Sequence, residues 1–424
     1  MRLLAWRLFL PGVTLALLAC SSPCQAQLVA LPGILEGEQL KKINDIYGEV
    51  TTSSSGQAGK LIPAFLDSLS TVDQRGISQT YHQMRELLND PSVVEALIQA
   101  LKTNRAELAS NILYHCRSYS STGAVDFSLP QIQELALCLS SANPVVRKNI
   151  CTLLNSVSPP NDTTLQTALI QVMTTDPSAQ VRSAAASTLG HFGREVYFKN
   201  ATPIADAFAK VLSEDANPQV RSAAASGLAQ MGGKAAPAAA AVCKALTDNS
   251  SQVRYQALQC IVNIGPPCAP AVNELIDLWN APADPYMHNS KDRLVQAFAA
   301  IGAPAATKAV PLIVSQLKER SSIHSVVTAL TKMGPDAVSA LPQMIKALDT
   351  PYAYDREAIA RALGTLGPAA KPAVEALKKA CRDERSAEGS GNADSAKRSA
   401  REALIRITGE APAINNSTAS NEGL

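Results

Sequence analysis

Aromatic and charged residues are scarce in this 424-residue sequence. Only 4% of the residues are Phe, Trp or Tyr and 17% are charged, whereas 46% are hydrophobic. Alanine supplies much of the apolar content, and it combines the highest helix propensity with a side chain that allows close helix packing. The composition therefore favours closely packed helices.

The sequence also lacks an excess of charge of either sign. Its formal net charge is +2, and it falls to 0 when residues 1–19, which carry Arg2 and Arg7 and no acidic residue, are left out. Nucleic-acid-binding proteins usually carry a basic surface that neutralises phosphates. We therefore expect no nucleic-acid partner. Beyond the N-terminal segment, no apolar run is long and uninterrupted enough to span a membrane.

Motifs of the common enzyme classes are absent. There is no HExxH, no GxSxG, no P-loop and no GxGxxG followed by an acidic residue. These motifs mark zinc proteases, serine hydrolases and nucleotide-binding sites. The five histidines are scattered singly along the chain. We therefore expect a protein that is not an enzyme, with no catalytic residue, no cofactor and no metal site.

The nine cysteines form no CxxC pair and no regular disulfide framework. Most of them lie among apolar residues in helical patterns, which is typical of buried free thiols. An exported protein could still oxidise some of them. Cys260 and Cys268 flank one short turn, and we predict them as the possible disulfide.

Residues 1–19, MRLLAWRLFLPGVTLALLA, are typical of an export signal. Arg2 and Arg7 precede an apolar run that is too short to span a bilayer. Two cleavage sites compete. LLAC at 17–20 resembles a lipobox that would leave a lipidated Cys20, whereas CQA at 24–26 predicts removal of residues 1–26 and a mature chain that begins at Gln27. We expect an exported protein, periplasmic or secreted, that contacts the membrane only through its signal or a lipid anchor.

The stretch VRSAAASTLG at 181–190 returns almost unchanged as VRSAAASGLA at 220–229. Alignment on the residue after the valine gives an arginine column of Arg147, Arg182, Arg221, Arg254, Lys291, Ile323, Arg356 and Arg398. Eleven residues later stands a glycine column of Ser158, Gly193, Gly232, Gly265, Gly302, Gly334, Gly367 and Gly409. Self-similar units of about 32–42 residues indicate a solenoid of stacked repeats.

Apolar residues within each copy have the spacing of an amphipathic helix. Positions seven and ten residues after the arginine column are apolar in nearly every copy, as in Leu189 and Phe192. Each glycine follows the last apolar residue, where a left-handed conformation costs glycine least. A second helix follows, such as PAVEALKKA at 372–380. The predicted fold is therefore all-α, a right-handed α-solenoid of about eight to nine helix-turn-helix repeats.

The turn before the arginine helix carries an aspartate six residues ahead of the arginine, in DPSAQVR (176–182), DANPQVR (215–221) and DNSSQVR (248–254). This aspartate can cap the coming helix or accept hydrogen bonds from the arginine of an adjacent repeat. We predict a structural ladder between repeats made of Asp176, Arg182, Asp215, Arg221, Asp248 and Arg254. The rival interpretation is a row of anion-binding arginines.

The pattern D-x-x-x-x-V-R-x-x-A-A-x-x-L, with Gly-Pro between units, resembles HEAT repeats. It is most similar to the short, alanine-rich type of the phycobilisome bilin lyases. The resemblance covers about residues 130–410 and departs from the pattern at Lys291, at Ile323 and at the insertion 383–397. It implies a curved α-solenoid used for binding, and no particular reaction.

The remaining segments complete the predicted organisation. We expect an amphipathic helix and a flexible linker over residues 27–60, with TTSSSGQAGK at 51–60 as the linker. Residues 61–140 are predicted to form degenerate helical repeats, with Arg105 in the arginine column, because terminal repeats of a solenoid usually diverge. Residues 141–409 form the regular array, and residues 410–424 are a polar tail predicted to be disordered.

Together these features predict an exported, monomeric, non-enzymatic scaffold that presents a concave surface to a protein or peptide partner. The segments 284–293 and 319–325 break the repeat and are candidate contact regions. The alternative, implied by the resemblance to bilin lyases, is a lyase-like or chaperone subunit that holds a chromophore or an enzyme partner.

Overall fold

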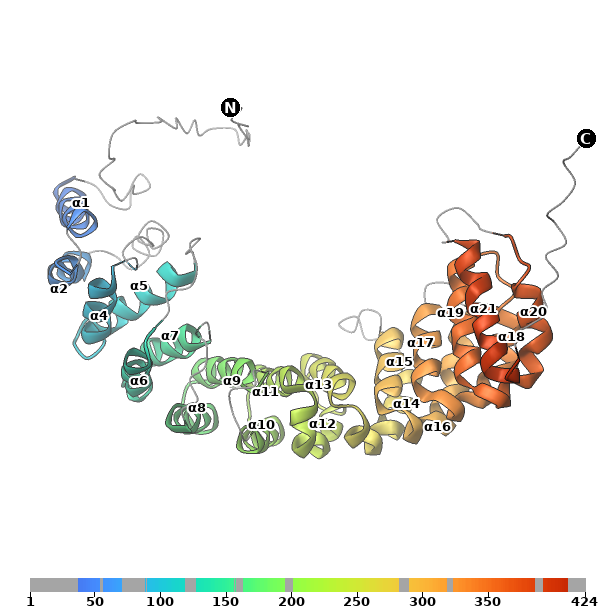
Figure 1. The fold of residues 1–424 in the computed structure, drawn as a ribbon. Coiled ribbons are helices and arrows are strands. Elements are labelled where there is room, and N and C mark those ends of the chain that lie inside the picture. The colour runs from blue at the N-terminus through green and yellow to red at the C-terminus, as the bar shows by residue number, and fades with distance from the viewer. Residues whose placement is uncertain are drawn as a thin grey trace, which may run out of the picture. The chain divides into compact units, whose positions relative to one another are not determined.

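The computed structural model describes residues 37–53, 56–70, 88, 90–118, 127–155, 157, 163–194, 201–281, 290–318, 323–385 and 392–410. Every regular element in these ranges is an α-helix or a short 3-10 helix (Figure 1). The predicted all-α fold is therefore confirmed. The predicted export signal with Cys20, and the tail after residue 410, lie outside the described residues. The chain divides into unit 1 (Met1–Val125) and unit 2 (Asp126–Leu424).

Unit 1 is built from short helices that pack around an apolar core. Its described helices are α1 (Gly37–Thr52), α2 (Ala58–Ser70), α4 (Pro91–Ala100) and α5 (Ala106–Ser118). α2 packs against α1 and α4, and α5 packs against α2 and α4. Tyr47 and Phe65 are fully buried in this core, with ring centroids 6.0 Å apart.

The prediction of a flexible linker over residues 51–60 is wrong at both ends of that segment. α1 continues to Thr52, and α2 already begins at Ala58. The Gly59 amide donates to Ser92 Oγ at 3.0 Å, and a Cβ at Gly59 would clash with the Ser92 carbonyl group. The small residues that suggested flexibility therefore allow α2 and α4 to lie close together.

The boundary between the two units falls after Val125, whereas the sequence placed the start of the array near residue 141.

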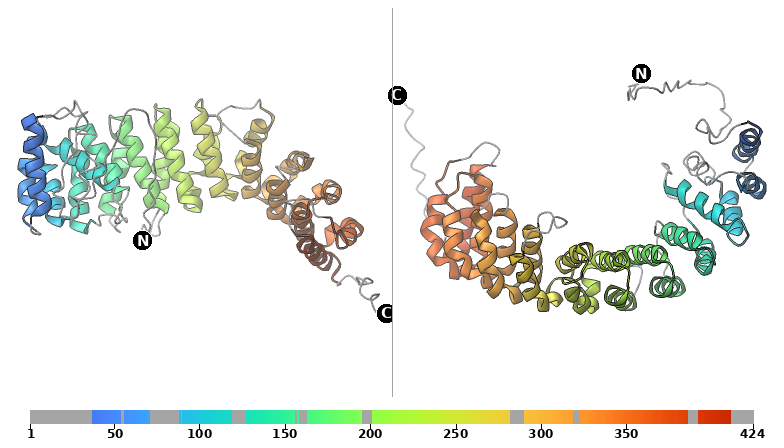
Figure 2. Two further views of the ribbon diagram at one scale, coloured as in Figure 1. Left: turned by 90° about the horizontal axis from the view of Figure 1, so that it is seen from above. Right: turned by 180° about the vertical axis from the view of Figure 1, so that it is seen from behind.

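Unit 2 contains a row of helices that follow the arginine column, which we call the arginine row. They are α7 (Pro144–Leu154), α9 (Ala179–Arg194), α11 (Pro218–Met231), α13 (Ser251–Ile264), α15 (Ser290–Ile301), α17 (Ile323–Met333), α19 (Ala353–Thr365) and α21 (Ala393–Thr408). Each of them packs against the next, so the row is continuous along the unit (Figure 2).

A second row runs beside it. It consists of α6 (Leu129–Leu137), α8 (Thr163–Thr175), α10 (Thr202–Glu214), α12 (Ala239–Ala245), α14 (Val272–Asn280), α16 (Ala303–Ile313), α18 (Leu341–Ala347) and α20 (Val374–Ala380). The 3-10 helices η2 (Cys138–Ser140), η3 (Gly232–Ala238), η4 (Pro266–Ala271), η5 (Val314–Lys318), η7 (Gly334–Ala340) and η8 (Gly367–Ala373) extend or precede them. Each second-row helix packs on the arginine-row helix that follows it, which confirms the predicted solenoid of helix pairs.

The glycine column reverses the chain between the two rows. Gly232, Gly265, Gly302, Gly334, Gly367 and Gly409 all have positive φ, between 57° and 78°. Gly265 shows how the reversal works: its amide donates to the Ile261 carbonyl, and its own carbonyl accepts from the Cys268 amide, both at 2.9 Å. One residue thus ends α13 and begins η4. A side chain at this φ would be strained, which explains why glycine recurs.

Two details of the glycine prediction are wrong. The ψ values of Gly232, Gly265 and Gly302 lie between −131° and −138°, so these three glycines do not have the left-handed helical conformation that we predicted, whereas Gly409, with ψ −5°, does. The second helix starts immediately at the glycine, and this sharp reversal requires the different ψ. Gly193 lies inside α9 instead of after it, where a Cβ would meet the Met231 side chain at 2.6 Å.

The register predicted for the last repeat is also wrong by one residue. The predicted register buries Ile405, which stands seven residues after Arg398. Ile405 is instead 44% exposed, whereas Leu404 and Ile407 are each 2% exposed. Lys397, not Arg398, therefore occupies the arginine column of α21. Lys397 donates to Glu384 at 2.6 Å. The insertion at 383–397 hid this shift, because it lengthens the turn from which the register was counted.

Candidate functional site

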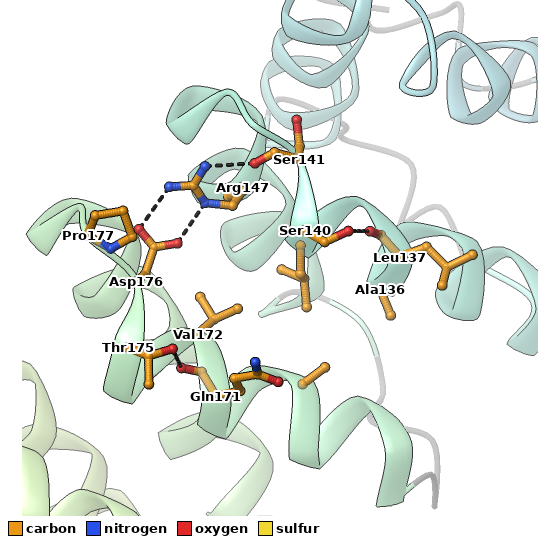
Figure 3. A pocket seen from close by; sticks show the side chains of 12 residues that line it. Ala136, Leu137, Ser140, Ser141, Arg147, Gln171, Val172, Thr175, Asp176 and Pro177 are labelled. Carbon is orange, nitrogen blue, oxygen red and sulfur yellow. Dashed lines mark hydrogen bonds and ion pairs between the residues drawn. The ribbon is translucent and has the colours of Figure 1, made fainter.

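Arginine and aspartate side chains join consecutive repeats at the start of the arginine row. Arg147 binds Asp176 through two parallel hydrogen bonds, from Nε at 2.6 Å and from Nη2 at 2.9 Å (Figure 3). Arg182 binds Asp215 in the same way at 2.7 and 2.9 Å, and Arg221 binds Asp248 at 2.8 and 2.8 Å. We call each of these Arg–Asp pairs a rung. Each rung joins one repeat to the next, and two-point pairing of this kind fixes the relative orientation of the two repeats as well as their distance.

The same arginines also bind the turns of their own repeats. Arg182 Nη1 donates to the Asp176 carbonyl at 2.8 Å, and Arg221 Nη1 donates to the Asp215 carbonyl at 2.9 Å. Arg254 Nη1 donates to the Asp248 carbonyl at 2.9 Å. Each aspartate is therefore contacted twice, at its carboxylate from the preceding repeat and at its carbonyl from its own. The structure thus brings all six predicted ladder residues into one connected chain of hydrogen bonds.

The ladder aspartates do not act as helix N-caps. The Asp215 carboxylate accepts from the Asn217 amide at 2.9 Å, two residues along the turn, and Asn217 is itself the N-cap of α11. Ser250 occupies the N-cap position of α13, two residues after Asp248. Of the two roles left open by the sequence, the geometry favours pairing with the neighbouring arginine, with the turn stabilised at the same time.

Electrostatics keep the rungs ionised. Burial by itself would raise the pKa of Asp176, but the hydrogen bonds from Arg147 and from the Ser178 amide outweigh it, so the pKa of Asp176 is lowered. The pKa values of Asp215 and Asp248 are lowered for the same reasons. Hydrogen bonding to Asp176 raises the pKa of Arg147. Since the guanidinium groups of Arg147, Arg182 and Arg221 each face a carboxylate, the geometry favours a structural ladder over a row of anion-binding arginines.

The pairing changes where the sequence departs from the repeat. The Lys291 ammonium lies 5.4 Å from the ring centroid of Trp279, so a cation–π contact stands where other repeats have an ion pair. Ile323 is 7% exposed and adds to the core. Of the predicted contact segments 284–293 and 319–325, residues 284–289 and 319–322 lie outside the described residues.

A charged cluster near the C-terminal end of unit 2 was missed by the sequence analysis. Arg385 binds Asp383 and Asp349, and Arg356 lies 3.7 Å from Asp383 while its Nη1 donates to the Thr350 carbonyl at 2.8 Å. The hydrogen bond from Arg385 is the main cause that lowers the pKa of Asp383 to about 2. Asp383 opens the insertion 383–397, and an aspartate at that point was the signal that could have revealed the cluster.

Unit 1 contains one related pair. Arg105, which the sequence placed in the arginine column, donates from Nε to Asp67 of α2 at 2.6 Å. The pair runs from an arginine to an aspartate that precedes it in the chain, opposite to the rungs of unit 2. The side chains are 29% and 56% exposed, which makes this a surface ion pair of small energetic weight.

Two cavities lie beside the rungs. One of about 440 Å³ lies between α6, α7 and α8, where Arg147 and Asp176 form part of its wall together with Leu137, Gln171 and Val172 (Figure 3). The next, of about 330 Å³, is one repeat further along and contains Arg182 and Asp215 with Lys210 and Glu214. The first is more apolar, and its Leu137 is 68% exposed. The cavities thus follow the repeat.

The exposed surface of the arginine row differs along its length. In α9, α11 and α13 the exposed residues are Gln180, Ser187, Arg194, Pro218, Gln219, Gln230, Gln252 and Asn263, of which only Arg194 is charged. In α15, α17, α19 and α21 the exposed charged residues are Lys291, Lys332, Arg361, Asp394, Arg398, Arg401, Glu402 and Arg406. The row therefore presents an uncharged polar surface that continues into a predominantly basic one.

The predicted disulfide between Cys260 and Cys268 is not formed, since both thiols are free and the two residues contact different neighbours. Cys260 Sγ donates to the Ala225 carbonyl of α11 at 2.7 Å. Thr188 makes the equivalent bond two junctions earlier, to the Cys151 carbonyl of α7 at 2.7 Å. Cys260 is therefore held between arginine-row helices, whereas Cys268 lies in η4 against the second-row residue Cys243.

None of the helices in the described ranges combines the length and apolarity that a membrane span requires.

Family models match three stretches of the chain: HEAT repeats at residues 205–290, a HEAT repeat at residues 165–196 and a PBS lyase HEAT-like repeat at residues 355–383. No match was found among curated proteins.

Several solved structures are similar in fold. An engineered protein matches with a TM-score of 0.59 and 17% identity, covering 89% of this chain and all of its own. Kap121p bound to Pho4p matches with a TM-score of 0.47 and 14% identity, covering 82% of this chain and 43% of Kap121p. The E. coli protein YibA matches with a TM-score of 0.44 and 17% identity, covering 68% of this chain and 94% of YibA.

Proposed function

Because the chain is a HEAT-repeat protein, we propose that it is a non-enzymatic scaffold whose arginine row presents a concave surface to a protein or peptide partner. The observation that carries this proposal is the polar surface shared by α9, α11 and α13, three helices whose repeats are joined by the Arg182–Asp215 and Arg221–Asp248 rungs. A surface that is ordered before binding loses little conformational entropy when a partner binds.

Close packing supports the concave assignment. A Cβ at Gly190 of α9 would lie 2.7 Å from the Cα of Gly227 in α11, so these two helices approach at backbone distance. The second-row helix α10 contributes larger buried side chains, Phe208 and Leu212. The backbones of α9, α11 and α13 also approach one another over more of their length than those of α8, α10 and α12 do. The more closely spaced row lies on the inside of a bend.

Charge placed on this surface tests the proposal. The full chain is immobilised and used to capture partners from an envelope extract, with Ser187→Glu and Gln230→Glu combined in one variant and Ser213→Glu on α10 as the control. All three positions are exposed. We expect one partner to be retained by the wild type and by the control and lost from the double variant. Equal capture by all three proteins, or no specific partner, would contradict the proposal and favour a structural spacer.

We also propose that the protein is exported, either as a periplasmic or secreted chain or as a lipoprotein. The support is the basic and apolar pattern of residues 1–19. Mass spectrometry of the N-terminus of the protein isolated from its own cells separates the two cases. A free Gln27 indicates cleavage after residue 26, and a lipidated Cys20 indicates the lipoprotein. An intact Met1 would contradict export by cleavage.

A chromophore-holding subunit is the second candidate, and the observation behind it is the PBS lyase HEAT-like match at residues 355–383. The purified protein would then absorb visible light or retain a pigment through chromatography. A colourless protein that still captures its partner would exclude this candidate.

A further inference from the structure

Two buried cysteines meet in the second row of unit 2. Cys243 lies in α12 and Cys268 lies in η4, and these two elements pack against each other. Cys243 Sγ is 3.9 Å from the Cys268 carbonyl oxygen. Cys243 is 9% exposed and Cys268 is fully buried. The two residues belong to consecutive repeats, so a bond between them would cross a repeat boundary.

The two thiols differ in acidity. Hydrogen bonding with the Cys268 side chain lowers the pKa of Cys243 against the opposing effects of burial and of the Glu274 charge. The same bond, together with burial, raises the pKa of Cys268. Since the thiolate is the nucleophile in disulfide exchange, Cys243 is the residue that reacts first. It is also the more accessible of the two.

The other described cysteines have different surroundings. Burial raises the pKa of Cys151 to about 12, and burial likewise raises the pKa of Cys260. Cys260 is held by its hydrogen bond to Ala225, and Cys138 Sγ donates to the Glu134 carbonyl at 3.6 Å. In the second-row pair, by contrast, a cysteine sulfur contacts another cysteine residue, from the following repeat.

We propose that Cys243 and Cys268 are a redox modification site that forms a disulfide by exchange with a small-molecule disulfide such as oxidised glutathione. The Cys243 thiolate attacks one glutathione sulfur and releases the other as a glutathione thiolate. The Cys268 thiol then loses its proton to solvent and displaces the second glutathione from Cys243. The two protein sulfurs are oxidised by two electrons in total, and one glutathione disulfide is reduced to two thiols.

The bond would tie the second helices of two repeats together and leave the arginine row untouched. It would therefore fix the spacing of the second row at the centre of unit 2, next to the polar surface of α9, α11 and α13. An oxidised chain would hold one curvature at this junction, whereas a reduced chain would retain some freedom there. This inference does not depend on the proposed partner.

Peptide mapping tests the site. The reduced full chain is incubated in native buffer with oxidised glutathione, its remaining thiols are alkylated after unfolding, and its peptides are identified by mass spectrometry. We expect a cross-link between the peptides of Cys243 and Cys268 in the wild type and in Cys260→Ser, which preserves the hydroxyl-type donor found at Thr188. In Cys268→Ser the reaction should stop with glutathione attached to Cys243.

Three results would overturn the site. One is a bond between Cys260 and Cys268, and another is alkylation of both Cys243 and Cys268 after prolonged native incubation. The third is a Cys243–Cys268 bond that forms only in denaturant, because the native arrangement would then not favour it. Circular dichroism of both variants before oxidation shows that each is folded.

Discussion

Two junctions of the arginine row, α9–α11 and α19–α21, use equivalent positions in different ways. At the first, Gly190 faces Gly227, and a Cβ on Gly190 would lie 2.7 Å from the Gly227 Cα. At the second, Gly364 faces Ala403, and a Cβ on Gly364 would lie 3.1 Å from the Ala403 Cα. The first junction has a two-point ion pair between Arg182 and Asp215, whose side chains are 15% and 8% exposed. At the second, Arg356 is more deeply buried but lies 3.7 Å from Asp383, which the exposed Arg385 binds directly.

The difference shows that the two-point Arg–Asp pairing is regular in one half of the row and altered in the other. Between α7 and α13, three rungs and close helix contacts recur with little variation. Between α15 and α21, Lys291, Ile323 and Lys397 stand in place of the arginine, and α19 retains it as Arg356. We call α7–α13 the regular half and α15–α21 the varied half. The ion pairs should contribute more to the stability of the regular half than the contacts that replace them contribute to the stability of the varied half.

Acid should have the largest effect, because it acts on all rungs of the regular half at once. The folded-state pKa values of Asp176, Asp215 and Asp248 are lowered from the ordinary value of 3.8. Their contribution to stability is therefore present above about pH 4 and is lost as pH falls through the folded values. Urea denaturation followed by circular dichroism should show a falling midpoint from about pH 5 downward.

The control for this experiment is the triple variant Asp176→Asn, Asp215→Asn and Asp248→Asn, which lacks the titrating rungs. It should be less stable than the wild type at neutral pH and should lose less stability on acidification. An acid loss of equal size in both proteins would show that other carboxyl groups are responsible. The charged cluster around Asp383 in the varied half should keep its contribution to stability down to a lower pH, because Asp383 stays ionised until about pH 2.

Removal of one rung partner should have the next largest effect. Asp215→Ala leaves the Arg182 guanidinium, whose side chain is 15% exposed, without its carboxylate. Breaking such a pair should lower the free energy of unfolding by about 2–4 kcal/mol, measured by urea denaturation. The control Glu375→Ala breaks the exposed pair with Lys378 and should change it by less than about 1 kcal/mol. Similar losses for the two variants would show that the rungs do not stabilise the array.

Alanine at the close helix contacts should have a smaller effect that differs between the junctions. Gly190→Ala forces a methyl group against the Gly227 backbone, and overpacking of this kind costs about 1–3 kcal/mol. Gly364→Ala meets its neighbour at a longer distance and should cost less in the same urea experiment. Gly233→Ala, where nothing lies within 4 Å of the added Cβ, is the control. The reverse order for Gly190 and Gly364 would contradict the assigned difference in packing.

Loss of the cation–π contact should have the smallest effect. Lys291→Ala removes the ammonium above Trp279 and should lower the free energy of unfolding by about 0.5–1 kcal/mol. Because Trp279 reports on its surroundings, its fluorescence should change as well. Lys291→Arg retains the cation and should retain most of the stability. A full loss in the arginine variant would show that packing of the lysine chain, and not its charge, supports this repeat.

Much of this fold could be predicted because it repeats. One ambiguous copy of VRSAAASTLG would have indicated only a helix, but eight aligned copies revealed the helix pairs, the reversing glycines and the ladder residues. Two of the errors fall where the repeat changes length or has not yet begun. The insertion before α21 shifted the register to Lys397, and the small residues at 51–60 were mistaken for a linker.

Contacts between repeats could not be predicted in the same way. Cys260 and Cys268 are near neighbours in sequence, yet Cys260 binds α11 and Cys268 binds Cys243 of the preceding repeat. Likewise, the cluster around Arg385 joins residues 349, 356 and 383, which no local pattern connects. Pairing of this kind depends on which faces of successive helices meet.

The amino-acid sequence by itself determined the elements: apolar periodicity specified the helices, glycine specified the reversals, and the Asp–Arg spacing specified which side chains stand at each turn. Only the tertiary structure decided how the elements are paired across repeats, including the direction of each rung, the approach of Gly190 to Gly227 and the meeting of Cys243 with Cys268. The physical reason is the sequence separation over which each kind of interaction acts. Helix and turn preferences act within a few residues, whereas these contacts join residues about 25–40 positions apart that meet only after the helices have stacked.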